Sequence, residues 1–440
     1  MFFLSKRKRV ATILSLLSLR RSYWVVASNT IYQVLGRFIS AAVAMIITRW
    51  LTRALGIEGY GSYQLIIAYA SFYWILTDFG LNAVAVKEMA AHSEQKELLW
   101  QQLLTLRFLL GLLLTLFLII LSFFLPYPPL IREGIIIVAL TILAQGIRGA
   151  CSGMFQLQLR YDLQLLAEGS GSLLFLVLVW LLLRQGAGLR AIVIAFLGQY
   201  LWVTLLNLLF VRRWSSWRFN FDRQGLKKMI QAALPLGLAL LFNLFANKLD
   251  TFLLSLRPQP HPPLEAVGYY GLGLKFFEFL LVLPVFFMNV LYPRLAKNFQ
   301  QGWLIFRQTI FKGFLVLLAL SISGGGFLFF TSPLLLKLVT QGVEIGPAVK
   351  VLRLLSLEAP LFFLSALLMW VLVILDHQRT LIFVYAVSFL FSFLANWFLI
   401  PHWSYLAPAL VKGGSEALIL LQLAFFSWYY SRNNDEKSRT

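Results

Sequence analysis

Long apolar stretches follow one another along almost the whole chain, separated by short polar segments. Each stretch is about as long as a helix that crosses the hydrocarbon core of a bilayer, which needs roughly 20 residues. The pattern predicts an all-α, polytopic membrane protein with about twelve transmembrane helices. The last predicted span is the least regular, because Pro408, Lys412, Gly413 and Gly414 interrupt it. The predicted spans are residues 24–48, 61–83, 103–125, 134–155, 164–183, 191–211, 229–256, 267–290, 308–330, 351–375, 381–400 and 406–430.

Most of these apolar stretches contain one or two charged residues. Arg37 lies near the middle of the first span, and the seventh contains Lys248 and Asp250. A charged side chain at the bilayer centre costs roughly 2.5–3.5 kcal/mol on insertion scales, so it persists where it faces a polar interior or a partner. Repeated charges on many spans indicate a hydrated interior, which is typical of a transporter.

The composition excludes a large soluble domain. Hydrophobic residues make up 60% of the 440 residues and charged residues 13%, whereas a soluble domain carries about 25% charged residues. The net charge of +20 comes mainly from basic residues in loops. If the N-terminus is cytoplasmic, that side of the membrane collects 22 Lys and Arg residues against eight on the other. This bias predicts that both termini are cytoplasmic.

The longest basic loop falls close to the middle of the chain, with six predicted spans on each side. We therefore predict a basic cytoplasmic segment over 1–23, an N-terminal six-helix lobe over 24–211 and an inter-lobe loop over 212–228. A C-terminal six-helix lobe over 229–430 and a cytoplasmic tail over 431–440 complete the predicted organisation.

The two halves resemble each other at one motif. Gly61 and Gly271 each follow a tyrosine, and Lys87 and Lys297 lie 26 residues after their respective glycines. With six spans in each half, such repeats would be parallel and related by an axis along the membrane normal.

Polar side chains recur at helical spacing on several spans, and such stripes can converge on one cavity. The alternative is that they hold neighbouring helices together. Asp78 and Asp250 are candidates for ion coupling, with structural pairing as the alternative, and Glu278 is close enough in sequence to pair with Lys275. Arg107, Lys312, Arg353 and Lys412 are expected to snorkel to the headgroup layer. The candidate cavity residues are Asn29, Gln33, Arg37, Arg148, Asn243, Asn247, Lys248 and Lys275.

The sequence offers no recognisable catalytic or metal-binding motif. It lacks the glycine-rich phosphate loop of nucleotide hydrolases and a nucleophile elbow. Its four histidines are far apart, and its single cysteine excludes an intrachain disulfide. We predict no cofactor, no metal, no nucleic-acid partner and no enzymatic activity.

Three motifs lie near the N-terminus: Leu55-Gly56, Tyr60-Gly61 and Asp78-Phe79-Gly80-Leu81. They resemble motifs of the polysaccharide-biosynthesis flippase family, which belongs to the multidrug/oligosaccharidyl-lipid/polysaccharide exporter superfamily. The resemblance implies two six-helix lobes around a central cavity. It also implies transport of a polyprenyl-pyrophosphate-linked oligosaccharide across the cytoplasmic membrane by alternating access.

In such a flippase, cationic residues of the cavity hold the anionic head of the lipid. By position, Arg37 and Lys248 would have this role here, with Arg148 and Lys275 as further candidates. The implied partners are the lipid-linked substrate and membrane lipids, with a polysaccharide polymerase and glycosyltransferases as candidate protein partners.

Two other functions remain open from the sequence. A multidrug exporter of the same superfamily should place acids centrally, whereas the deepest charge here is Arg37. This difference does not exclude an exporter, because spans one, two, seven and eight contain three acids and three cations. A membrane-embedded enzyme of polysaccharide assembly usually needs a large external loop with catalytic residues. The predicted outward loops are short.

Overall fold

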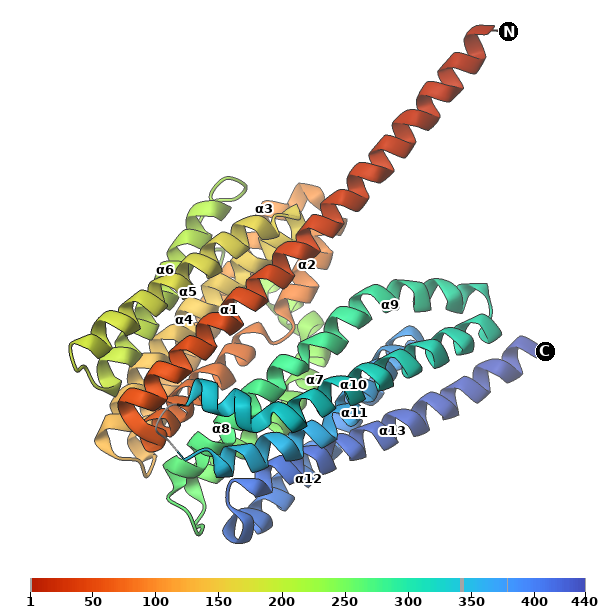
Figure 1. Ribbon diagram of the computed structural model, residues 1–440. Coiled ribbons are helices and arrows are strands. Elements are labelled where there is room, and N and C mark those ends of the chain that lie inside the picture. The colour runs from red at the N-terminus through yellow and green to blue at the C-terminus, as the bar shows by residue number, and fades with distance from the viewer. Residues whose placement is uncertain (1, 341–343, 378, 440) are drawn as a thin grey trace.

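The computed structural model describes the backbone of residues 2–340, 344–377 and 379–439. The side chains of residues 1–31, 33–35, 37, 93, 239, 246–247, 341–343, 378 and 432–440 lie outside the description. Within the described backbone the chain is helical and contains no strand (Figure 1). The helices are α1 (Phe2–Asp78), α2 (Leu81–Ala91), α3 (Lys96–Phe124), α4 (Pro129–Gln158), α5 (Tyr161–Arg184), α6 (Leu189–Val211), α7 (Arg223–Leu256), α8 (Pro263–Leu280), α9 (Val282–Gln301), α10 (Trp303–Val339), α11 (Gly346–Ile374), α12 (Thr380–Trp403) and α13 (Leu406–Arg439), with a short 3-10 helix, η1 (Ser93–Gln95).

Ten helical segments of the described chain are long and apolar enough to cross a membrane. One of them, Phe38–Ala91, contains the end of the predicted span 24–48 and the whole of the predicted span 61–83. Between these two spans α1 bends at Gly56, where the backbone has a φ of 70°. The α7 helix adds a further 34 residues. The predicted fold class, an all-α membrane protein with about twelve spans in two lobes around a cavity, is confirmed.

Two predicted spans are interrupted, and one expected interruption is not observed. The second span breaks at Phe79 and Gly80, which have φ values of 40° and 74°. The eighth is divided between α8 and α9. By contrast, α13 continues through Pro408 and the glycines that follow. Pro408 lies in the first turn of α13, where the missing amide hydrogen leaves no helical bond unmade.

The helices form two lobes (Figure 1). In the first lobe α3 packs on α4, α4 on α6, and α1 on α5; in the second α10 packs on α11, α11 on α13, and α7 on α12. In Figure 1 the lobes meet near the bend of α1 and the start of α8, and they spread apart toward the two chain termini. We call the end with the termini the terminal side, and the opposite end the far side.

The lobes are joined by side-chain and backbone contacts on the far side. The Tyr127 hydroxyl lies 2.7 Å from the Ser255 hydroxyl oxygen, which connects the α3–α4 loop to the end of α7. Arg49 Nη1 of α1 donates to the carbonyl oxygen of Leu338 at 2.8 Å, near the end of α10. Gly61 of α1 lies directly against the α8 backbone. These contacts close the far side between the lobes.

Candidate functional site

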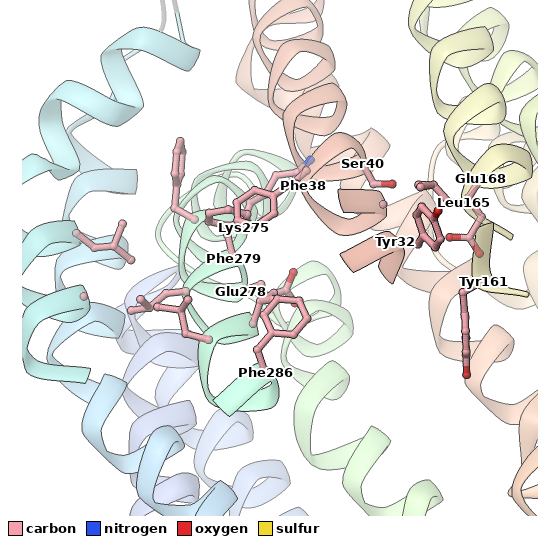
Figure 2. Close-up of a pocket in the computed structure, with 18 of the residues that line it drawn as sticks. Tyr32, Phe38, Ser40, Tyr161, Leu165, Glu168, Lys275, Glu278, Phe279 and Phe286 are labelled. Carbon is pink, nitrogen blue, oxygen red and sulfur yellow. The ribbon is translucent and has the colours of Figure 1, made fainter. Parts of the chain in front are cut away.

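A cavity of about 970 Å³ lies between the two lobes, on the terminal side of the Gly61 contact. We call it the central cavity. Its walls come from α1, α5, α8, α9 and α10, with one residue from α4. Figure 2 shows the first lobe contributing Tyr32, Ser40, Tyr161 and Glu168 on one side, opposite the α8 and α9 residues on the other. The labelled second-lobe residues are Lys275, Glu278, Phe279 and Phe286.

A smaller pocket of about 250 Å³ extends from the central cavity into the first lobe. We call it the N-lobe pocket. Ser40, Glu168 and Lys275 line both spaces, so the two adjoin. The other polar residues of the N-lobe pocket come from three neighbouring helices, and aromatic rings complete its wall. These residues are Arg148, Ser172, Gln199, Tyr200, Tyr63, Phe175 and Phe196.

Lys275 stands at the boundary between the two spaces. Its Nζ donates to Thr48 Oγ1 of α1 at 2.9 Å, a contact between the lobes. None of the ion pairs among the described side chains includes Lys275. The expected pairing with Glu278 is not observed, because Glu278 Oε1 lies 3.2 Å from Lys248 Nζ of α7. Lys275 therefore places a positive charge at the cavity wall, and no described carboxylate forms an ion pair with it.

Arg148 lies in the N-lobe pocket and is paired there. Its Nη2 donates to Glu168 Oε1 at 2.9 Å, and Gln164 Nε2 donates to the same oxygen at 3.0 Å. Its guanidinium also lies 5.6 Å from the centre of the Tyr200 ring, within reach of a cation–π interaction. Glu168 was missed in the sequence analysis, although its signal was available, an acid four residues after Gln164 in a predicted span.

Asp78 forms an ion pair with Arg107 of α3. The Arg107 side chain is only 2% exposed, so the expectation that it snorkels to the headgroup layer is wrong. Gly149 of α4 leaves the space that the guanidinium fills. An inward-facing cation in a dry environment requires a partner, and Asp78 supplies it.

Asp250 forms an ion pair with Lys412 of α13, with 3.4 Å between Nζ and Oδ2. It also accepts a hydrogen bond from the Tyr270 hydroxyl. The Lys412 side chain is 10% exposed, so its expected snorkelling is wrong for the same reason as for Arg107. Two more carboxylates, Glu358 and Glu416, interact electrostatically with Lys412. Together these residues form a charged cluster inside the second lobe.

None of the remaining sequence candidates has a described side chain that lines the central cavity or the N-lobe pocket. The side chains of Asn29, Gln33, Arg37 and Asn247 lie outside the described residues; the α1 backbone places position 37 between Gly36 and Phe38, which both line the central cavity. Among the described α7 residues, Asn243 and Lys248 do not line either space. No cluster of three potential metal ligands occurs among the described residues.

The sequence matches a model of a known protein family. The family described as polysaccharide biosynthesis protein matches residues 26–299, more than half of the chain. No curated protein sequence matches the chain.

Solved structures share the fold at low sequence identity. An inward-facing multidrug resistance MATE family transporter of the MOP superfamily has a TM-score of 0.74 at 13% identity, covering 94% of this chain and 99% of its own. The lipid II flippase MurJ, in an inward closed conformation, has a TM-score of 0.73 at 13% identity, with 90% and 87% covered. A MOP superfamily transporter from Pyrococcus furiosus has a TM-score of 0.65 at 14% identity, with 94% and 96% covered.

Proposed function

Since the chain belongs to the polysaccharide biosynthesis protein family, we propose that it is a flippase for a lipid-linked oligosaccharide. In this proposal the cargo is a polyprenyl-pyrophosphate-linked precursor of a cell-surface polysaccharide. The protein moves its head across the cytoplasmic membrane by alternating access, while the lipid tail stays in the bilayer. Similarity of fold to a lipid II flippase supports a cargo of this kind.

The observation that carries the proposal is Lys275 in the wall of the central cavity. A pyrophosphate is a dense anion that only accepts hydrogen bonds, so it needs a cation whose charge is not already neutralised. Lys275 meets this requirement because its described hydrogen bond goes to the neutral hydroxyl of Thr48. This contact also joins the lobes, so a phosphate that draws Lys275 away from Thr48 would alter an inter-lobe contact.

The other proposed anion contacts differ from Lys275 in their surroundings. Arg37 belongs to the same proposal by its position in the sequence, in the stretch of α1 whose residues Gly36 and Phe38 line the central cavity. Lys248 and Arg148 are each neutralised by a carboxylate, Glu278 and Glu168 respectively. We therefore assign the direct contact with the anion to Lys275 and Arg37, and none to Lys248 or Arg148.

A multidrug exporter is the second candidate, supported by the fold of a multidrug resistance transporter. A cationic drug needs an acid in the cavity whose charge is available. Both acids in the described cavity wall, Glu168 and Glu278, are paired with cations. This pairing favours the flippase over the exporter.

The proposal includes the orientation of the chain and its partners. The excess of Lys and Arg on the terminal side supports cytoplasmic termini, and thus a cavity that receives its cargo from the cytoplasmic leaflet. The cargo itself and the surrounding lipids are the proposed partners, with glycosyltransferases and a polymerase as proposed protein partners. No enzymatic step is part of the proposal.

The coupling of transport to an ion gradient is proposed for Asp250 rather than Asp78. Asp78 has a single described cation as partner, Arg107. Asp250 belongs to the charged cluster of the second lobe, where one lysine faces several carboxylates. A proton or another cation can enter such a cluster by replacing Lys412 as the partner of a carboxylate.

The test is head-group translocation in vesicles that contain the purified protein and a fluorescent polyprenyl-pyrophosphate-linked disaccharide. Lys275→Met should lower the initial rate by roughly tenfold or more, as expected for loss of one charge-assisted contact. Lys275→Arg should retain most of the rate. The double variant Lys248→Met/Glu278→Gln is the matched control, since it removes a paired lysine together with its carboxylate and keeps the net charge, and its rate should fall less.

Equal rates for the wild type and Lys275→Met, at equal protein content, would contradict the assignment of Lys275. Efflux of a cationic dye from the same vesicles, without head-group translocation, would support the exporter instead.

A further inference from the structure

We infer that the N-lobe pocket is a separate subsite for one neutral sugar ring, the ring attached directly to the pyrophosphate. This inference rests on the proposed function. It adds that two parts of the cargo bind in two adjoining spaces. The pyrophosphate would lie at Lys275 in the central cavity, and the first sugar would enter the first lobe.

Apart from Lys275 at its boundary, the N-lobe pocket offers a phosphate no unpaired cation among its described residues, and its polar groups suit a polyol. Arg148 and Glu168 form an ion pair there, so together they add no net charge. Glu168 and Lys275 line both spaces, so the feature that sets the N-lobe pocket apart is Arg148, whose charge is already neutralised. A neutral ring with several hydroxyl groups can instead accept from the guanidinium and donate to the carboxylate at the same time.

Unsatisfied acceptors in this region favour a ligand with hydroxyl donors. The side-chain carbonyl oxygens of Gln199 and Gln164 are buried and have no hydrogen-bond partner in the protein. Gln199 lines the N-lobe pocket and Gln164 lines the adjoining central cavity. A buried acceptor without a donor costs roughly 1–3 kcal/mol, which a hydroxyl group of the cargo would recover once the amide turns toward the pocket. A phosphate oxygen has no hydrogen to donate and cannot satisfy these groups.

Aromatic side chains line the pocket and are held by their neighbours. Tyr200 lies under Arg148 and is stacked on Trp74, with 4.7 Å between ring centres and 23° between planes. Trp74 donates through Nε1 to Thr141 Oγ1 at 3.0 Å. The centre of the Phe196 ring lies 5.0 Å from the centre of the Tyr200 ring. These contacts hold the Tyr200 ring in place, which reduces the entropy lost on binding.

The size of the pocket limits it to one ring. Its volume of about 250 Å³ is the space of about eight water molecules. That space accommodates a single pyranose but excludes a longer oligosaccharide, which must remain in the central cavity. Because Lys275 lines both spaces, a phosphate held at its Nζ has its attached sugar at the entrance of the N-lobe pocket.

The test compares two short-chain probes in detergent solution: farnesyl pyrophosphate, and farnesyl pyrophosphate carrying one N-acetylglucosamine or glucose. Wild-type protein should bind one of the sugar-bearing probes more tightly than the sugarless probe. Gln199→Leu should reduce this difference by roughly three- to tenfold without changing the affinity for the sugarless probe. The double variant Arg148→Met/Glu168→Met should also reduce the preference for the sugar-bearing probe and leave the affinity for the sugarless probe unchanged. It removes both charges of the ion pair together, so the net charge of the pocket does not change.

Gln145→Leu is the matched control. Its carbonyl oxygen is also buried without a partner, but Gln145 lines neither space, so this variant should keep the sugar preference. Each variant is checked for thermal unfolding and for a single gel-filtration peak.

The outcomes distinguish a failure of the sugar subsite from a failure of the proposed flippase function. If both probes bind the wild type equally, or if Gln199→Leu and the double variant keep the full sugar preference, the subsite is wrong while the flippase proposal stands. If the wild type binds no pyrophosphate probe, the proposed function itself is contradicted, and the subsite with it. Loss of affinity for both probes in Lys275→Met, together with selective loss of the sugar preference in Gln199→Leu, would support the division of the cargo.

Discussion

Gly61 of α1 and Gly268 of α8 lie side by side where the two lobes meet on the far side. A Cβ atom at Gly61 would overlap the Leu264 carbonyl oxygen, and one at Gly268 would lie 2.6 Å from the Ile57 carbonyl oxygen. Only residues without a side chain allow the two backbones to approach this closely. The contact joins the two segments in which the halves of the sequence resemble each other.

The first prediction concerns this crossing. Gly61→Ala should open the far side between the lobes, since the added methyl group meets backbone atoms that have no rotamer to change. Overpacking of this kind costs roughly 1–3 kcal/mol. The measurement is the yield of cross-linking between Arg49→Cys and Leu338→Cys with a short bismaleimide, in a Cys151→Ala background that removes the single native cysteine.

Gly169→Ala is the control for this prediction, because no atom lies within 4 Å of a Cβ at that position. It should leave the cross-linking yield at the level of the parent protein. A yield for Gly61→Ala that equals the Gly169→Ala yield would show that the glycine contact does not hold the lobes together.

The second prediction concerns the carboxylate that opposes an anion in the central cavity. Glu278→Gln removes a negative charge from the cavity wall and leaves Lys248 without its described partner. Farnesyl pyrophosphate should then bind roughly three- to tenfold more tightly. Release on the other side should slow, so the turnover in the vesicle assay should fall even though binding improves. An unchanged or weaker affinity would mean that Glu278 does not act on the bound anion.

The third prediction concerns the ion pair between the buried Arg107 and Asp78, whose side chain is 38% exposed. Asp78→Asn leaves an almost fully buried guanidinium without a charge partner and should destabilise the protein by roughly 3 kcal/mol. The double variant Asp78→Asn/Arg107→Met should recover much of this loss because no unpaired charge remains. Thermal unfolding in detergent measures both. If the double variant is less stable than the single variant, the pair contributes through shape and hydrogen bonds rather than charge.

The sequence predicted the fold well because the bilayer limits the length of each helix. The predicted span 381–400 corresponds to α12 (Thr380–Trp403), and the predicted span 191–211 to α6 (Leu189–Val211). The breaks between α1 and α2 and between α8 and α9 could not be predicted in the same way. They depend on local backbone conformations, such as the positive φ of Phe79, that hydrophobicity does not encode.

The site was less predictable because ion pairs depend on how helices are rotated against one another. Lys275 and Glu278 are three residues apart in one helix, yet they reach toward α1 and α7 respectively. Glu168 and Arg148 belong to neighbouring spans, and only their packing shows that they pair. The sequence identified charged residues inside spans, whereas the structure determines which of those charges remain available to a ligand.

The last prediction tests Asp250 as the coupling residue. Asp250 shares Lys412 with other carboxylates of the second lobe: Glu358 lies against the α13 backbone at Gly413, and Glu416 accepts from Ser365. If a proton or cation enters this cluster during transport, Asp250→Asn should abolish the acceleration of head-group translocation by an imposed pH or sodium gradient. Exchange of the probe without a gradient should continue. The control is Asp78→Asn/Arg107→Met, which removes the ion pair of the other lobe and should keep the response. If Asp250→Asn vesicles respond to the gradients as strongly as wild-type vesicles, the coupling ion binds elsewhere, and the cluster serves only to hold α7, α11 and α13 together.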